Sequence, residues 1–229
     1  MRMWQTIRAD TLDWHSHDAA YAALVLAGSY EEAGDHGRFQ VEAGDVLCHD
    51  RFEGHVDRFP ASNAVVLNLP LQIGCWFTPG AAKVADPDLI VSAAERSHTE
   101  AVDLLFSMIR EQRSSHMDWP DALAAALIQD PCLMVSQWAE QQRLAPWTVS
   151  RGFKHVFGIS PEAFRARRRA RHAWKVIQTT TEPLVQVAFR LGFADQSHMS
   201  RSVKQMTGME PKAWRVSANR FKTAGTSQV

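Results

Sequence analysis

A short pattern of residues occurs twice in the C-terminal half of this 229-residue chain, and it restricts the possible folds more than any other feature. Each copy reads Ser-Arg-x-x-Lys, with a Gly four residues after the Lys and a Pro three residues after that Gly. The first copy begins at Ser150 and the second at Ser200, so the two are 50 residues apart. Repeats at such a spacing predict two copies of one helical unit.

The formal net charge is zero, but the charges are unevenly distributed along the chain. Residues 1–124 contain 9 Lys and Arg against 19 Asp and Glu, whereas residues 125–229 contain 16 against 6. A basic surface attracts nucleic acid, because binding releases the counterions condensed on the phosphates. The split predicts a division of labour between an acidic and a basic half, the alternative being two solvated surfaces of opposite sign.

Three negative observations restrict the cellular setting. No segment approaches the roughly 18 apolar residues of a membrane span, and the N-terminus lacks an apolar core followed by a cleavage site. The cysteines, Cys48, Cys75 and Cys132, form no C-x-x-C pair, which indicates reduced thiols. We therefore expect a cytoplasmic protein without a membrane partner.

The acidic half has the pattern of short strands. Apolar and β-branched runs alternate with Gly, Asp and Asn turns over residues 4–70, which is typical of a small β-sandwich or barrel. The clearest of these strands are expected at residues 22–27, 38–41, 46–48 and 64–69.

Histidines are concentrated in this predicted sheet. Alternate residues of a strand point to the same face, so His15 and His17 are able to converge on one ligand, with His55 as a third nitrogen and His49 nearby. Three imidazoles suit a borderline divalent metal. Three interpretations stay open: a metal site of His15, His17 and His55, an organic-ligand pocket lined by these residues and Tyr21, and a purely structural sandwich.

The spacing of these residues resembles the cupin family. His15-x-His17, three residues, Tyr21, six residues and Gly28 are similar to the first cupin motif, with Tyr where metal-binding cupins usually carry Glu. Gly44-Asp45 through His55, with Asn63 beyond, is similar to a degraded second motif. The resemblance covers about residues 10–70 and implies a sensor or enzyme domain of cupin fold.

Residues 81–120 are expected to be a linker that contains a helix. Apolar residues at helical spacing predict a helix from about residue 92 to residue 113. Its apolar face is wide, which favours packing between domains or pairing with a second copy, although packing on its own sheet fits the pattern equally well.

The basic half predicts two helix-turn-helix units. Helices are expected at residues 133–142 and 146–157, then at 184–191 and 196–207, with a long arginine-rich helix over 161–180 between them. A helix, a tight turn and a second helix form the layout whose second helix enters the DNA major groove. Asp195 is well placed to cap the last of these recognition helices, whereas Ala145 at the corresponding place offers no capping side chain.

Residues 131–216 resemble the DNA-binding domain of the AraC family of transcriptional regulators, most specifically from Leu184 to Arg215. Met199 and Val203 stand where the family usually has aromatic residues. The resemblance implies a cupin-like sensor domain (residues 1–80), the linker (81–120), a double helix-turn-helix domain (121–218) and a disordered tail (219–229). It also implies double-stranded promoter DNA, a small-molecule effector and RNA polymerase as partners, with a homodimer as a further expectation.

By the same resemblance, one face of each recognition helix contacts DNA. Arg is able to bond guanine at two places and Gln does likewise with adenine, whereas Lys mainly meets phosphate. The expected DNA-binding residues are Trp147, Ser150, Arg151 and Lys154 in the first unit, and Gln196, Ser197, His198, Arg201 and Lys204 in the second.

The sequence therefore predicts a multidomain α and β protein, with a small cupin-like β-sandwich or barrel followed by an all-α domain. The function expected from it is sequence-specific transcriptional regulation, activating or repressing, in response to a small molecule or ion, without catalytic residues or a definite cofactor. Two alternatives differ in class: a metal-dependent cupin enzyme fused to a DNA-binding module, and a constitutive architectural DNA binder.

Overall fold

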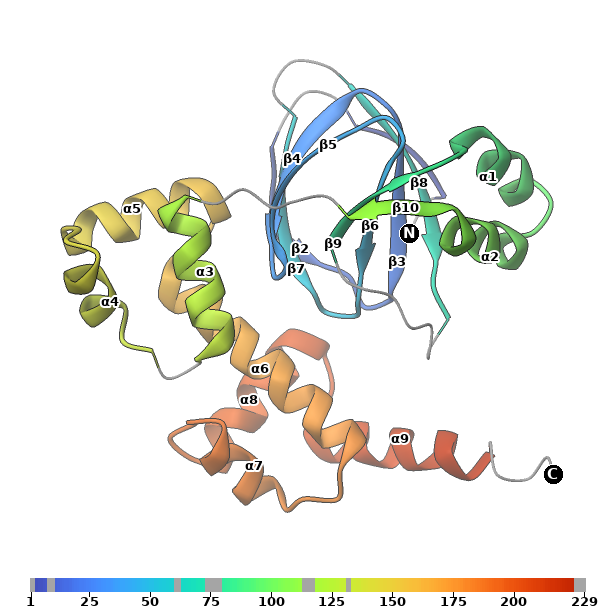
Figure 1. The fold of residues 1–229 in the computed structure, drawn as a ribbon. Helices are drawn as coiled ribbons and strands as arrows, with labels where there is room; N and C mark the ends of the chain where they lie inside the picture. Colours follow the sequence, from blue (N-terminus) through green and yellow to red (C-terminus); the bar gives the residue numbers. More distant parts are fainter. Residues whose placement is uncertain are drawn as a thin grey trace. The chain divides into compact units, whose positions relative to one another are not determined.

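The structure is a computed structural model that describes residues 3–7, 11–59, 63–72, 80–112, 118–130 and 133–224, with side chains described as far as residue 217. The chain divides into two compact units, residues 1–122 with 153–158 and residues 123–152 with 159–229. The first is built mainly of strands and the second of helices (Figure 1). This confirms the predicted fold class.

Two antiparallel sheets form the first unit. The larger sheet has, in spatial order, β1 (Trp4–Ile7), β8 (Ala64–Pro70), β3 (Tyr21–Ala27), β6 (Asp45–His49), β9 (Gly80–Val84) and β10 (Ile109–Gln112). The smaller sheet has β2 (Thr11–Ser16), β7 (Gly54–Arg58), β4 (Ser29–Gly34) and β5 (Gly37–Glu42).

Alternation along the central strand β3 divides the apolar residues of this unit into two layers. Tyr21, Ala23 and Val25 point into the space between the sheets, where they pack with residues of the smaller sheet such as Tyr30. The side chains between them, such as Leu24, point to the other face of the larger sheet. Since both faces of β3 are covered, the strand is a continuous apolar run in the sequence.

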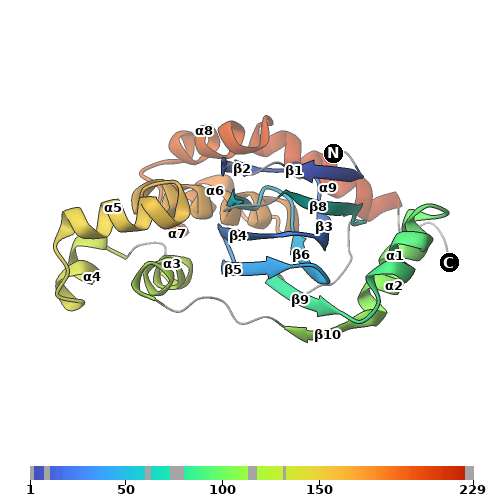
Figure 2. The same cartoon turned by 90° about the horizontal axis from the view of Figure 1, so that it is seen from above.

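Helices α1 (Pro87–Ala94) and α2 (His98–Met108) cover that outer face, as Figure 2 shows. The structure therefore differs from the expected helix over residues 92–113. The side chain of Ser97 accepts a hydrogen bond from Glu100 N and begins a new helix, and from Ile109 the chain continues as the edge strand β10. Ala101 and Leu105 are fully buried against the larger sheet, so this helix packs on its own sheet.

Residues 81–112, expected to lie in a linker, thus contribute two strands and two helices to the first unit. Local patterns did not indicate this, because β9 is short and pairs with β6, more than thirty residues earlier in the chain. Cys48 is buried and carries a free thiol, while Cys75 and Cys132 lie outside the described residues. Within the described part of the chain, no helix is both long and apolar enough to cross a membrane.

The helical part of the chain contains α3 (Trp119–Gln129), α4 (Val135–Gln141), α5 (Pro146–Phe157), α6 (Pro161–Thr179), α7 (Leu184–Arg190), α8 (Gln196–Thr207) and α9 (Pro211–Ala224). The bounds of α5 and α8 are those predicted from the sequence. Helix α9 continues through the first six residues of the expected disordered tail, and residues 225–229 lie outside the described residues.

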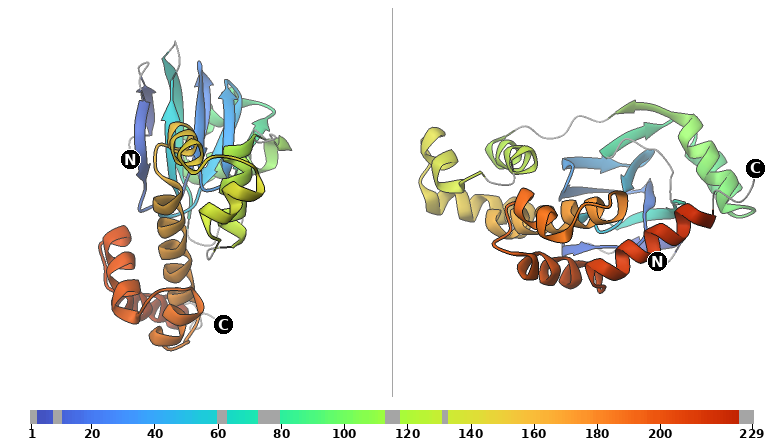
Figure 3. Two further views of the ribbon diagram at one scale, coloured as in Figure 1. Left: turned by 90° about the vertical axis from the view of Figure 1, so that its left-hand side faces the viewer. Right: turned by 90° about the horizontal axis from the view of Figure 1, so that it is seen from below.

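The long helix α6 is the backbone of the second unit. Helices α7, α8 and α9 gather around its C-terminal half, as both views in Figure 3 show. Its buried residues Phe164, Trp174 and Ile177 supply apolar contacts. Two of its arginines are used internally: Arg165 donates to the carbonyl of Leu133 and Arg169 to that of Gly192. Because these guanidinium groups hold loops in place, only part of the arginine-rich helix is available to phosphate.

Candidate nucleic-acid interface and sensor pocket

Helix α5 has one apolar and one exposed polar face. Val149, Phe153 and Phe157 are completely buried, and the rings of the two phenylalanines stack with their centroids 4.5 Å apart. All four residues predicted to contact DNA from this helix, Trp147, Ser150, Arg151 and Lys154, are exposed. The side chain of Trp147 is 66% exposed, which is unusual for so large an apolar residue without a partner to cover it.

Helix α8 repeats this division and is capped at both ends. The carboxylate of Asp195 accepts a hydrogen bond of 2.7 Å from His198 N, and Gly208 ends the helix in the left-handed conformation with φ 76°. These are a preferred N-cap and a preferred C-cap. Met199 and Val203 are completely buried, so they fill the core where the AraC-like pattern usually has aromatic residues.

The predicted DNA-contacting residues of α8 lie on its outer face. Ser197, Arg201 and Lys204 are exposed, while Gln196 and His198 are partly buried. The ring of His198 lies edge-on to Phe193, with centroids 5.5 Å apart. Lys204 is already paired with Glu210 at 2.8 Å, a partner that sequence reasoning missed. Because this pair is well exposed, phosphate is able to compete with the carboxylate for the lysine.

The first recognition helix lacks a capping side chain. Ala145 O accepts the first helical hydrogen bond, from Val149 N, so Ala145 occupies the N-cap position. We expect Ala145→Ser to stabilise the chain by about 1 kcal/mol, since a serine hydroxyl would satisfy a free N–H group in the first turn. Equilibrium denaturation of the full chain measures this change. An unchanged or lower free energy of unfolding in the serine variant would contradict it.

A pocket with a volume of about 340 Å³ lies in the first unit, between the two sheets. The predicted ligand-pocket residues His15, His17, Tyr21 and His55 all line it. Strand pairing explains why they meet: His15 lies opposite His55 in the β2–β7 register, and Tyr21 lies opposite His49 in the β3–β6 register.

Three imidazole rings surround that of His55 in this pocket. The ring centroid of His55 lies 4.3 Å from that of His15, 5.7 Å from that of His17 and 4.6 Å from that of His49. Tyr21 stacks on His49 at 4.6 Å. Burial lowers the pKa of His17 to about 4, and burial together with the neighbouring imidazoles holds the pKa of His55 well below its usual value. At neutral pH the rings of His17 and His55 are therefore uncharged and keep a lone pair for a ligand.

Two carboxyl groups complete the pocket, and sequence reasoning missed both. Glu32 and Asp57 lie opposite each other in the β4–β7 register and both are buried. Burial and the negative charge of Asp57 raise the pKa of Glu32 well above its usual value, and burial raises that of Asp57 to about 7. Neither carboxyl group belongs to a cupin-like motif. Both reach the histidines only through the pairing of strands that are distant in the sequence, so the motifs did not indicate them.

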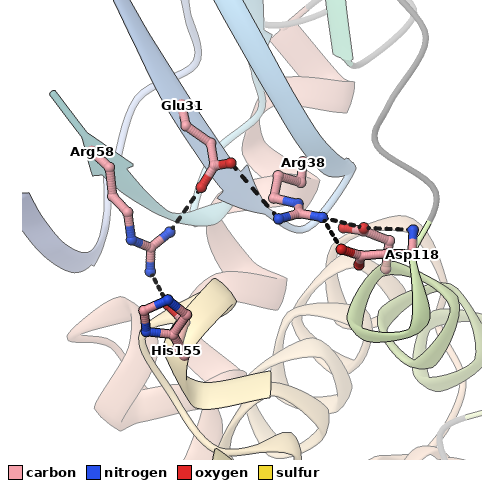
Figure 4. Close-up of polar contacts among 6 residues, drawn as sticks. Glu31, Arg38, Arg58, Asp118 and His155 are labelled. Atoms are coloured by element: carbon pink, nitrogen blue, oxygen red, sulfur yellow. Dashed lines mark hydrogen bonds and ion pairs between the residues drawn. The ribbon is translucent and has the colours of Figure 1, made fainter. Parts of the chain in front are cut away.

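The same two strands carry a charged network on their other face (Figure 4). The carboxylate of Glu31 lies 3.3 Å from Nη1 of Arg58 and 3.8 Å from Nη1 of Arg38. Arg58 Nη2 donates to the carbonyl of His155, in the segment of α5 that belongs to the first unit. Arg38 Nη2 binds Asp118 at 2.7 Å and Asp121 at 2.8 Å.

Comparison with known proteins gives a family match for the helical unit. A family model described as a helix-turn-helix domain matches residues 138–217. The chain is 25% identical over 225 residues to the uncharacterized HTH-type transcriptional regulator YobQ of Bacillus subtilis, covering 91% of each. It is 32% identical over 81 residues to the arabinose operon regulatory protein of Escherichia coli, covering 35% of this chain and 28% of that protein.

Among solved structures, ToxT from Vibrio cholerae aligns over 94% of this chain and 98% of its own, with a TM-score of 0.44 and 10% identity. The two exposed recognition helices and the family match define a DNA-binding protein of the helix-turn-helix class. More specifically, residues 138–217 form a helix-turn-helix domain, and the chain is similar to an HTH-type transcriptional regulator over most of its length and to arabinose operon regulatory proteins over 81 residues.

Proposed function

We propose that this regulator responds to a ligand: the first unit binds a small molecule or ion, and its occupancy changes binding of promoter DNA by α5 and α8. The single observation that carries the proposal is the pocket between the sheets, whose buried histidines and carboxyl groups are too costly to keep in a purely structural core. The exposed faces of helices α5 and α8 would provide the DNA-binding activity that the ligand regulates.

On the DNA, the exposed arginines would read bases. Arg151 and Arg201 have the reach to donate two hydrogen bonds to guanine, and Gln196 to do so with adenine. Lys154 and Lys204 would neutralise phosphates and fix the register. Trp147 offers an apolar contact for a thymine methyl group, while Ser150, Ser197 and His198 complete the two faces.

In the pocket, an organic effector would contact His15, His17, Tyr21 and His55. If the effector is an ion, the first ligand set to consider is His15, His17 and His55, in which one nitrogen from each residue lies within 4.8 Å of the others. Either ligand would have to bind the DNA-competent and incompetent states with different affinity, since a ligand without such a difference shifts no equilibrium.

Strands β4 and β7 offer a route for this coupling. Glu32 and Asp57 face the pocket, while their neighbours Glu31 and Arg58 form the charged network on the opposite face. A ligand that moves the two strands would therefore move Arg58, whose guanidinium holds the carbonyl of His155 near the end of α5. Because α5 is a recognition helix, its position is the quantity to be regulated.

We further infer that the chain acts by binding rather than by catalysis. The curated relatives reported above are named as regulators, not as enzymes. The proposed partners are double-stranded DNA, an effector, a second copy of the chain and, by family resemblance, RNA polymerase. Binding to promoters would take place in the cytoplasm.

The proposal is tested by selecting genomic DNA fragments with the full chain and then measuring affinity for the recovered site. We expect a specific site bound at least about 10³-fold more tightly than unrelated DNA.

A panel of metabolites and metal salts is then screened for a rise in melting temperature of the protein. At least one hit is expected to change DNA affinity about five- to 150-fold, the usual range of allosteric coupling.

Two outcomes would contradict this proposal. Equal affinity for all fragments would leave only non-specific attraction between basic residues and phosphate. A specific site whose affinity no member of the panel changes would favour the architectural alternative, in which the first unit has no sensing role. Turnover of a hit compound by the purified protein would restore the enzyme alternative.

A further inference from the structure

The structure brings together a second group of potential metal ligands that the motif-based set does not contain. One donor atom each from Glu32, His49 and His55 lie within 4.8 Å of one another, and all three residues are buried. They come from β4, β6 and β7, so both sheets contribute. The cupin-like motif lacks a carboxylate because Tyr21 stands at that position, and in this group Glu32 supplies one from another strand.

The imidazole nitrogens of this group have unused hydrogen-bonding capacity. Both nitrogens of His49 and Nδ1 of His55 are buried without a hydrogen-bond partner among the described residues. The two histidines are each 2% exposed. Buried polar atoms in native proteins are almost always paired, because an unpaired one keeps its full desolvation cost. Buried imidazole nitrogens without hydrogen bonds on two residues whose ligand atoms lie within 4.8 Å of each other indicate a missing partner that accepts electron pairs.

The spacing of Glu32 and His49 fits a shared ion better than a hydrogen bond. Oε2 of Glu32 lies 3.5 Å from Nε2 of His49, which is long for an N–H···O bond. Two ligands in a tetrahedral zinc site, with bonds of about 2.0–2.2 Å, are separated by about 3.4 Å. The pair therefore already has the separation that two ligands of one tetrahedral ion would have.

A second carboxylate is placed to orient His49. Oε1 of Glu53 lies 3.8 Å from Nδ1 of His49, and the other oxygen of Glu53 accepts a hydrogen bond from Asp50 N and pairs with His36. A carboxylate behind one nitrogen of an imidazole holds the ring with its other nitrogen toward the metal. This arrangement leaves Nε2 of His49 as the ligand atom, on the side of Glu32.

We propose that Glu32, His49 and His55 bind one divalent cation of the zinc, cobalt or nickel type, and that this ion is the effector of the first unit or holds the effector there. The set of two imidazoles and one carboxylate suits borderline cations and not Mg²⁺ or Ca²⁺, which require mainly oxygen. His15 or His17, on the more exposed side of the pocket, would supply a fourth donor. This inference rests on the proposed sensing role of the pocket.

Titration of the full, untagged, chelator-treated chain with Co²⁺ tests the site directly, because the visible absorption of bound Co²⁺ reports its coordination. We expect one equivalent to bind with the intense bands of a tetrahedral site, and Zn²⁺ to displace it. The variants Glu32→Gln and His49→Asn are each expected to weaken binding at least about 100-fold, the upper end of the loss caused by removing an outer-shell partner. His98→Asn, at an exposed histidine of α2, is the matched control and is expected to bind normally.

Circular dichroism and thermal melting without metal establish that each variant is folded. If Glu32→Gln misfolds, His49→Asn alone decides, because the ring nitrogens of His49 make no hydrogen bond within the described residues whose loss would unfold the chain. Failure of the wild type to bind Co²⁺ or Zn²⁺ overturns the site, as does undiminished binding by folded variants.

DNA affinity with and without Zn²⁺ is a separate measurement. If the metal binds but DNA affinity is unchanged, the metal is not the effector, although the metal site itself is confirmed. An organic effector acting on a protein without bound metal leaves the proposed sensing function intact and overturns the effector role of the metal.

Discussion

Replacing Arg151 and Arg201 together by alanine is expected to lower the affinity of the full chain for its specific DNA site by about 30-fold or more. An arginine that donates two hydrogen bonds to guanine is worth about 1–3 kcal/mol of discrimination, or roughly five- to 150-fold in affinity. The two residues occupy equivalent positions of the 50-residue repeat. Since they lie on separate recognition helices, their losses should be nearly additive.

The folded state should tolerate this change. Both arginines are exposed, and the structure gives neither a hydrogen bond nor an ion pair among the described side chains. Surface substitutions of this kind change stability by less than about 0.5 kcal/mol. Fluorescence anisotropy with labelled specific and unrelated DNA measures the two affinities, and Arg110→Ala, at an exposed arginine of β10, is the control.

The specific and unrelated DNA must respond differently for the assignment to hold. Loss of base contacts reduces specific binding much more than non-specific binding, whereas loss of phosphate contacts reduces both about equally. An equal loss of affinity for both DNAs would mean that Arg151 and Arg201 contact the DNA phosphates and not the bases. Unchanged affinity for the specific DNA would mean that neither residue belongs to the DNA interface.

The helical unit was predictable because its signals are local. The N-cap Asp195, the C-terminal Gly208 and the prolines that begin α5 and α9 are each defined by a few neighbouring residues. Such caps fix where a helix begins and ends, and the period of the buried residues fixes which face is outward. The bounds of both recognition helices, and the exposure of Arg151 and Arg201, follow from these local signals.

The pocket was only half predictable, for the opposite reason. His15 and His17 are neighbours in one strand, so alternation alone places them on one face. Glu32 reaches them through the pairing of β4 with β7, and His49 through the pairing of β6 with β3. These registers join residues far apart in the sequence, and a shift of one residue would turn each side chain to the other face. No local pattern distinguishes Glu32 from Glu31, its neighbour outside the pocket.

The glycines of the two cupin-like motifs also differ in a way that only the structure reveals. Gly28 and Gly44 both have left-handed φ values, of 76° and 88°. A Cβ added to Gly28 would lie 2.3 Å from the backbone oxygen of Asn63, whereas one added to Gly44 would meet the flexible end of Lys83 at 3.4 Å and Pro87 Cγ at 3.8 Å. An alanine at either position carries the cost of a left-handed backbone, but at Gly28 it also collides with the adjoining chain.

We therefore expect Gly28→Ala to destabilise the first unit by about 2–5 kcal/mol, the sum of about 1–2 kcal/mol for a left-handed alanine and about 1–3 kcal/mol for the overpacking. Gly44→Ala, with a similar φ and no backbone collision, should lose only about 1–2 kcal/mol. Denaturant unfolding followed by far-ultraviolet circular dichroism compares the two variants with the wild type. Equal losses would mean that the backbone near Asn63 moves aside at little cost, and that Gly28 is required for its φ alone. A larger loss at Gly28 would show that close approach of β3 and β8 is what this glycine maintains, and with it the wall of the pocket on which Tyr21 stands.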